Sequence, residues 1–273
     1  MSAAFDTIHH STLQTILHDR FGVNSSALNW FESYHSGRTQ SLHVGKQSSA
    51  TSQLKRGVPQ GSIVGPVEFI SYTEDLVNLV SPSNVICHLF ADYTQLLTSM
   101  NLSTISTSRS NIETCRPISN IHQWCASRGL QLNPDKTELI WFGSTANLEK
   151  LKLTDNSITV GSVTINPSDS VRDLGVQFDC QLSMRSHVSK ISSICFYHLC
   201  RLRQLKHILN TAIRHRLACA LILTRIDYCN SVLAGLPATT LAHLQRVMNA
   251  AARFVLGLGP RDHITSALAS LHW

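Results

Sequence analysis

The sequence predicts an α+β domain followed by an all-helical module, and three observations lead to this class. Strand-like alternation of apolar and polar residues is mixed with helical patterns as far as about residue 179. Beyond that point the apolar residues recur at helical spacing only, as at Ile191, Ile194, Cys195, Leu199 and Leu202. Basic residues also gather at the start of this second part. We therefore predict one domain at 1–179 and another at 180–273.

The first forty residues read as two short helices. The first, "STLQTILHDRFG", closes on Gly22, and the second, "SSALNWFESYHSG", has Ser26 as its cap and Gly37 as its stop. The segments "TQSLHVGK" and "SATSQLKRG" then alternate as strands do. The glycine- and proline-rich "GVPQGSIVGP" predicts a loop that opens a buried helix over "VEFISYTEDLVNLV".

Two β-rich runs, "NVICHLFAD" and "TQLLTSM", predict a hairpin with Asp92 at or near its exposed turn. A long helix is predicted from about Ser103 to Arg128. Thereafter "GLQLNPDKTELIWFG" predicts a proline-containing turn and a strand, "SITVGSVTI" a hairpin around Gly161, and "DSVRDLGVQFD" a further strand. Together these elements make the first domain a mixed α+β unit.

The composition limits the class of protein. With 273 residues, of which 43% are hydrophobic, the chain is able to bury a sizeable core. It has neither a run of ~20 apolar residues nor a signal-peptide pattern, so we expect an intracellular protein of the nucleus or cytoplasm with no membrane partner. The eight cysteines contain no C-x-x-C pair, which favours free thiols. His215 and Cys219, one helical turn apart, leave a zinc site open as an alternative, although no second pair completes it.

The net charge of +6 is unevenly distributed. From Gln181 to Arg225 the chain has no Asp or Glu, but it has eight basic residues: Arg185, Lys190, Arg201, Arg203, Lys206, Arg214, Arg216 and Arg225. A solvated helix face normally mixes both signs, so this segment indicates a polyanionic partner, with nucleic acid as the leading candidate. A chance bias on ordinary solvent-exposed helices is the alternative.

These features together fit the needs of phosphoryl transfer from a nucleoside triphosphate. That reaction needs divalent ions held by carboxylates, a polar group near the incoming nucleotide, a cation near the triphosphate and a basic surface for the copied strand. Asp92, Gln60 in "PQG", Lys136 and the segment 181–225 are the candidates. Each also has a plain interpretation, because Asp is common in turns and Gln60 and Lys136 lie in loop sequences.

The order of five stretches resembles motifs A to E of the reverse transcriptases of LINE-type, non-LTR retrotransposons. The stretches are "SAAFDTIHH", "RGVPQGSIVGP", "FADYTQL", "GLQLNPDKTELIWFGS" and "VRDLGVQFD". The later "RIDYCNSVLAGLP" and "LQRVMNAAARFVLG" are similar to the thumb and connecting region of the same elements. The resemblance implies an RNA-directed DNA polymerase, truncated at both ends, with a right-hand palm, incomplete fingers and a helical thumb.

The resemblance also implies roles for individual residues. Asp92 would be the motif C metal ligand for magnesium, and Lys136 would lie near the triphosphate as a second catalytic residue. The nucleotide pocket would contain Phe5, Pro59, Gln60 and Gly61, and the primer grip Leu174, Gly175 and Val176. Contacts to RNA template and DNA primer would come from the basic residues Lys55, Arg56, Arg185, Lys190, Arg201, Arg203, Lys206, Arg214 and Arg216. Deoxynucleoside triphosphates would be the substrates.

Two departures from the family pattern bear on activity. The family's motif A reads D-L-S-A-A-F-D, and Met1 stands in place of its leucine, so we expect the first metal-binding aspartate to be missing; Asp6 matches the second acid, which is not a ligand. Motif C ends in two aspartates in the family, whereas here Tyr93 follows Asp92. A neutral, bulky phenol is a poor magnesium ligand.

We therefore expect weak or absent magnesium binding and a defective polymerase. Most of the fingers and any endonuclease domain are also expected to be absent. Two alternatives remain open: a nucleic-acid-binding module without catalysis, and a relic of a decayed element with no function.

Overall fold

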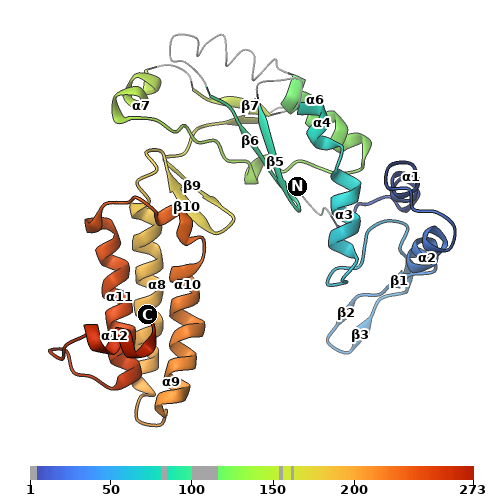
Figure 1. Ribbon diagram of the computed structural model, residues 1–273. Coiled ribbons are helices and arrows are strands. Elements are labelled where there is room, and N and C mark those ends of the chain that lie inside the picture. The colour runs from blue at the N-terminus through green and yellow to red at the C-terminus, as the bar shows by residue number, and fades with distance from the viewer. Residues whose placement is uncertain (1–4, 81–84, 100–115, 154–155, 161–162) are drawn as a thin grey trace. The chain divides into compact units, whose positions relative to one another are not determined.

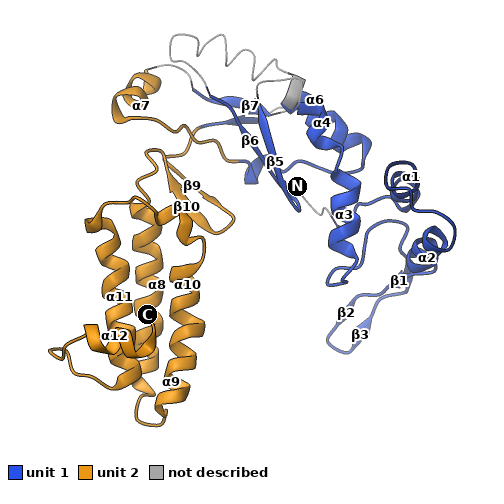
Figure 2. Ribbon diagram, in the orientation of Figure 1, with its two compact units in different colours: residues 1–137, 155–166 blue, residues 138–154, 167–273 orange. Residues whose placement is uncertain are grey.

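A computed structural model describes residues 5–80, 85–99, 116–153, 156–160 and 163–273. The chain divides into two compact units (Figure 2). Unit 1 comprises residues 1–137 and 155–166, and unit 2 comprises residues 138–154 and 167–273. Each unit has a hydrophobic cluster of its own. The functional domains expected at 1–179 and 180–273 stay a prediction. The two units are defined by how compactly the chain packs, and this does not show which residues carry a function.

Unit 1 contains the two N-terminal helices that the sequence predicts (Figure 1). Helix α1 runs His10–Phe21 and ends at Gly22, whose φ of 66° suits glycine. Helix α2 runs Ser25–His35 and begins after Asn24. The prediction of Ser26 as the cap is wrong, because Ser26 lies inside the first turn.

The other helices of unit 1 follow the expected loops. The buried helix forms as α3, Gly65–Thr73, and α4, Leu76–Val80, with a break between them. Helix α6, Arg116–Ser127, is the part of the predicted Ser103–Arg128 helix that is described from residue 116 onward; residues 103–115 lie outside the described residues. A short 3₁₀ turn at Pro134–Lys136 confirms the proline-containing turn.

The described strands form five separate antiparallel pairs. In unit 1 these are β1 (Thr39–Gln40) with β4 (Ser52–Gln53), β2 (His43–Val44) with β3 (Gln47–Ser48), β5 (Ile86–Phe90) with β6 (Tyr93–Leu97), and β7 (Ile158–Val160) with β8 (Val163–Ile165). Two expected hairpins are thus confirmed as strand pairs: the one with Asp92 near its turn is β5–β6, and the one around Gly161 is β7–β8. The fold is a mixture of helices and small sheets, and the palm and thumb layout stays a prediction.

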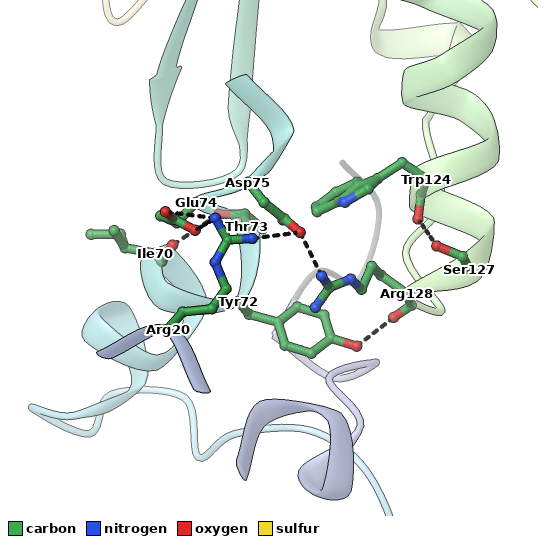
Figure 3. A network of polar contacts seen from close by, with 9 residues as sticks. All are labelled: Arg20, Ile70, Tyr72, Thr73, Glu74, Asp75, Trp124, Ser127 and Arg128. Carbon is green, nitrogen blue, oxygen red and sulfur yellow. Dashed lines mark hydrogen bonds and ion pairs between the residues drawn. The ribbon is translucent and has the colours of Figure 1, made fainter. Parts of the chain in front are cut away.

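A polar network fixes the C-terminal end of α3 in unit 1 (Figure 3). Asp75 accepts from Arg128 at 2.6 Å and lies 3.2 Å from the Arg20 guanidinium, which also reaches Glu74. Tyr72 donates its hydroxyl hydrogen to the Arg128 carbonyl at 2.7 Å. Because Arg20 belongs to α1 and Arg128 follows α6, the network joins three helices around the end of α3.

Unit 2 is mainly helical. Its elements are α7 (Thr145–Lys152), β9 (Ser170–Asp173), β10 (Val176–Asp179), α8 (Arg185–Gln204), α9 (Thr211–Ala218), a π-helical turn (Cys219–Leu223), α10 (Thr224–Asp227), a 3₁₀ turn (Asn230–Leu233), α11 (Ala238–Leu256) and α12 (Thr265–Leu271). Helices α8, α9 and α11 enclose the core around Cys195, Leu199 and Phe254.

Two strand predictions for this part of the chain are corrected. The strand expected after the Pro134 turn is not formed, and Leu139 makes only an isolated bridge to Pro167. The segment "DSVRDLGVQFD" was expected as one strand, yet it forms the β9–β10 hairpin with Val176 opposite Asp173. The two-residue turn at Leu174–Gly175, where φ is 42° and 91°, divides the strand.

Among the described residues seven cysteines are free, and His215 lies 3.8 Å from the Cys219 sulfur without a third ligand in reach. Burial raises the pKa of Cys125 and of Cys195 to about 11, so both are inert thiols at neutral pH. No helix within the described parts of the chain has the length and apolar character needed to cross a bilayer.

Candidate active site and nucleic-acid interface

The segments that resemble motifs A and B lie side by side in unit 1. The Val58 amide donates to the Phe5 carbonyl at 2.8 Å, and the Gly57 amide donates to the Ile8 carbonyl at 2.8 Å. A Cβ at Gly57 would lie 3.0 Å from the Asp6 carbonyl oxygen, so only glycine permits this approach. Backbone contacts therefore hold together two segments that lie far apart in the sequence.

The side chains of these two segments also meet. Gln60 donates its amide hydrogen to the Asp6 carboxylate at 3.1 Å, and both residues are exposed. The Phe5 ring stacks on Phe69 of α3, with 5.0 Å between ring centroids. Pro59 is half-buried and Gly61 is exposed with φ of 79°. The structure thus brings together the four residues predicted for the nucleotide pocket, although their role there stays a prediction.

Asp92 lies in the two-residue turn between β5 and β6. The turn is Ala91–Asp92, and Phe90 pairs with Tyr93 across it. Asp92 is half-buried, so the expectation of an exposed tip is only partly met. Tyr93 is 55% exposed on the same face as Phe90. The opposite face, with Cys87, Leu89 and Leu96, packs against the core that includes Phe69.

Lys136 ends the 3₁₀ turn Pro134–Lys136. The Asn133 side chain accepts from the Asp135 amide at 3.0 Å and caps the turn, and Lys136 is exposed. This arrangement leaves the ammonium group in solvent. Its placement near a triphosphate remains a prediction.

The predicted primer-grip residues form the turn of the β9–β10 hairpin in unit 2. Leu174 and Gly175 are the turn residues and Val176 is the first, buried residue of β10. Tyr228, which follows α10, donates its hydroxyl hydrogen to the Leu174 carbonyl. No local pattern signals this contact, because the two residues are 54 positions apart.

Helix α8 displays four of the eight basic residues of segment 181–225 to solvent. Its buried stripe contains Val188, Ser192, Cys195, Leu199 and Leu202, and packs chiefly on α11. The side chains of Arg185, Lys190, Arg201 and Arg203 are exposed. Lys190, Tyr197 and Arg201 recur at helical spacing on one exposed face, and Arg201 donates to the Tyr197 hydroxyl at 2.9 Å. Sequence reasoning missed Tyr197, although a tyrosine in register with cations on a helix is a detectable signal.

The other basic residues differ in how they are engaged. Lys55, Arg56 and Arg216 are exposed, and Lys206 is half-buried. Arg214 donates to the Phe254 carbonyl at 3.1 Å and to the Thr211 hydroxyl at 3.0 Å. It therefore stabilises the C-terminal end of α11 in this structure, which makes it the weakest of the candidate phosphate contacts.

A profile of the family described as reverse transcriptase (RNA-dependent DNA polymerase) matches residues 1–178. The chain belongs to this family, as its motifs indicate. It is also 25% identical over 215 residues to a protein named "Probable RNA-directed DNA polymerase from transposon BS" of Drosophila melanogaster. That match covers 77% of this chain but only 22% of the relative.

Reverse transcriptases generally use magnesium, and the described residues fit such a site poorly. They contain no group of three or more His, Cys, Asp or Glu side chains arranged to hold a metal. At the motif C turn the residues are one carboxylate, Asp92, and one phenol, Tyr93. This donor set is less than paired divalent ions require, so we derive no step through magnesium.

Proposed function

We propose that this chain is a reverse-transcriptase domain of transposon origin that holds primer–template nucleic acid and has lost efficient nucleotide incorporation. The family match over residues 1–178 and the transposon polymerase relative support the origin. Helix α8 supports the binding, and the Asp92–Tyr93 turn supports the loss of catalysis.

The exposed face of α8 is the observation on which the proposed binding depends. Lys190 and Arg201 provide charge for phosphates, and Tyr197 provides a flat ring for a base or sugar. No acid lies between Gln181 and Arg225 to neutralise these cations within the segment. A helix face with cations, an aromatic ring and no carboxylate suits an extended polyanion better than a protein partner.

The motif C turn is the reason for proposing a defect. Transfer of a nucleotidyl group depends on fixed charge that stabilises the phosphates in the transition state. Tyr93 occupies the position of a carboxylate in the family pattern, and as a neutral phenol it supplies no charge at pH 7. The residues that contact nucleic acid are unaffected by this substitution, so binding persists when catalysis fails.

The binding is tested by measuring affinity for a labelled RNA–DNA primer–template over a range of salt concentrations. Each phosphate contact contributes about 0.9 to the slope of log affinity against log salt. We expect a steep slope for the wild-type chain and a smaller one for the double variant Lys190→Gln, Arg201→Gln.

The matched control is Arg246→Gln with Arg261→Gln, which removes the same charge from exposed positions elsewhere in unit 2. The control should keep the wild-type slope. Weak binding with no salt dependence in the wild-type chain would reject the proposal in favour of a relic without function.

A further inference from the structure

Tyr228 makes an unusual contact with the turn of the β9–β10 hairpin. Its phenol donates to the Leu174 carbonyl, and its ring lies beneath Gly175, where an added Cβ would be 3.2 Å from the ring carbon Cε1. Gly175 has φ of 91°, so the turn requires glycine for its conformation as well as for this close approach. Leu174 also has positive φ, at 42°. The contact therefore holds a turn whose backbone is already tightly specified.

The hairpin is fixed to the helical part of unit 2 at three levels. At its base, Asp179 accepts from the Ser183 amide at 2.8 Å, in the loop that leads into α8. At its middle, the Gln177 amide donates to Nδ1 of His187 in α8 at 3.2 Å. At its tip, Tyr228 contacts Leu174. Without the Tyr228 contact, the hairpin would be held only at its base and middle, and its tip would be unsupported.

The direction of the Leu174 carbonyl determines the direction of the Gly175 N–H. The two groups belong to one planar trans peptide and point to opposite sides of it. With the carbonyl engaged by Tyr228, the Gly175 N–H points away from Tyr228, and no described residue accepts a hydrogen bond from it. It is thus a fixed backbone donor at the tip of the hairpin, and a phosphate oxygen is a suitable acceptor.

We infer that Tyr228 is a positioning residue for the turn predicted as the primer grip, acting by aiming the Gly175 N–H at a phosphate of the primer strand. This inference rests on the proposed function, because it assumes that the chain holds a primer–template. It adds a residue outside the hairpin itself and assigns it a specific task.

The first measurement is amide hydrogen exchange in Tyr228→Phe, which keeps the ring and removes only the hydroxyl. We expect exchange at Val176, which pairs with Asp173 across the turn, to accelerate about fivefold, the effect of losing one hydrogen bond. Tyr34→Phe is the matched control, since it removes a phenolic hydroxyl from half-buried Tyr34 in unit 1. It should leave exchange at the turn unchanged.

The second measurement uses a primer with a photoreactive group near its 3′ end. In the wild-type chain we expect cross-links at residues 174–176, and in Tyr228→Phe about fivefold fewer at this turn. Affinity for the whole primer–template should change by less than about twofold, because the cations of α8 supply most of it. If Tyr228 had only a structural role, cross-linking at the turn and affinity would fall together. A positioning role predicts fewer cross-links at nearly unchanged affinity.

The outcomes separate the two proposals. Equal exchange and equal cross-linking in wild type and Tyr228→Phe, with the duplex bound normally, would overturn the role of Tyr228 alone. If the wild-type chain does not bind the duplex, the proposed function fails and the primer role fails with it.

Discussion

Units 1 and 2 use their cationic side chains in opposite ways. In unit 1, Arg20 and Arg128 converge on Asp75 and tie helices together (Figure 3). In unit 2, the four cations of α8 form no ion pair with a described residue, and Arg201 contacts a tyrosine instead. Basic content alone therefore does not define a binding surface. What matters is whether acids within the fold already engage the cations.

The largest expected effect tests whether the two cores are independent. Phe69→Ala removes a fully buried ring from the unit 1 core and should lower the stability of that unit by about 3–5 kcal/mol. Because unit 2 has a separate core around Leu199, its exchange-protected amides should be unaffected. Hydrogen exchange on the intact chain would check both statements. Equal loss of protection in both units would show that they unfold together.

The next effect tests the polar network of unit 1. Asp75→Asn removes the charge that both Arg20 and Arg128 contact, and we expect a loss of about 2 kcal/mol in urea unfolding followed by tryptophan fluorescence. Trp124 lies beside the Arg128 guanidinium and is a suitable reporter. Asp19→Asn is the matched control, because that carboxylate is 60% exposed. If Asp75→Asn lowers the free energy of unfolding no more than Asp19→Asn does, the network adds little to stability.

A smaller effect tests how the hairpin is attached in unit 2. Burial, with a contribution from Lys190, lowers the pKa of His187, whose Nδ1 must be unprotonated to accept from the Gln177 amide. The unfolded chain, with a pKa near 6.5, binds the proton at higher pH than the folded chain does. Stability from this residue is therefore complete above about pH 6.5 and is lost as pH falls through the folded pKa.

The measurement is the free energy of unfolding of unit 2 between about pH 7.5 and 5.5. His187→Asn, which keeps an acceptor but does not titrate, should show a weaker decline than wild type. Burial also lowers the pKa of His10 in unit 1, so a probe specific to unit 2 is needed. Identical pH profiles for wild type and His187→Asn would contradict the assignment.

Local patterns predicted much of the fold and of the site. The glycine stop of α1, the loop before α3 and the hairpin with Asp92 in its turn follow from residues close together in sequence. The motif order predicted that Phe5 and Gln60 belong to one nucleotide pocket, and the structure places their segments in contact. Local chemistry sufficed for the first three features, because each is set within a few residues, whereas the grouping of Phe5 with Gln60 came from the resemblance in motif order.

The features that sequence reasoning missed depend on contacts between distant residues. Tyr228 meets Leu174 across 54 positions, and Arg128 meets Asp75 across 53. The strand expected after Pro134 has an apolar run suited to a strand, yet within the described residues it forms only the single bridge between Leu139 and Pro167. A pattern of residues indicates what a segment is able to form, whereas its partners decide what it does form.

A primer-extension assay with saturating protein tests whether this chain binds a primer–template without extending it. With magnesium present, we predict that the wild-type chain binds the primer but does not extend it. If the missing carboxylate is the main defect, the Tyr93→Asp variant should extend the primer detectably. The same substitution should leave binding unchanged, because Tyr93 lies in unit 1 and the cations of α8 lie in unit 2. Robust nucleotide incorporation by the wild-type chain would contradict the account.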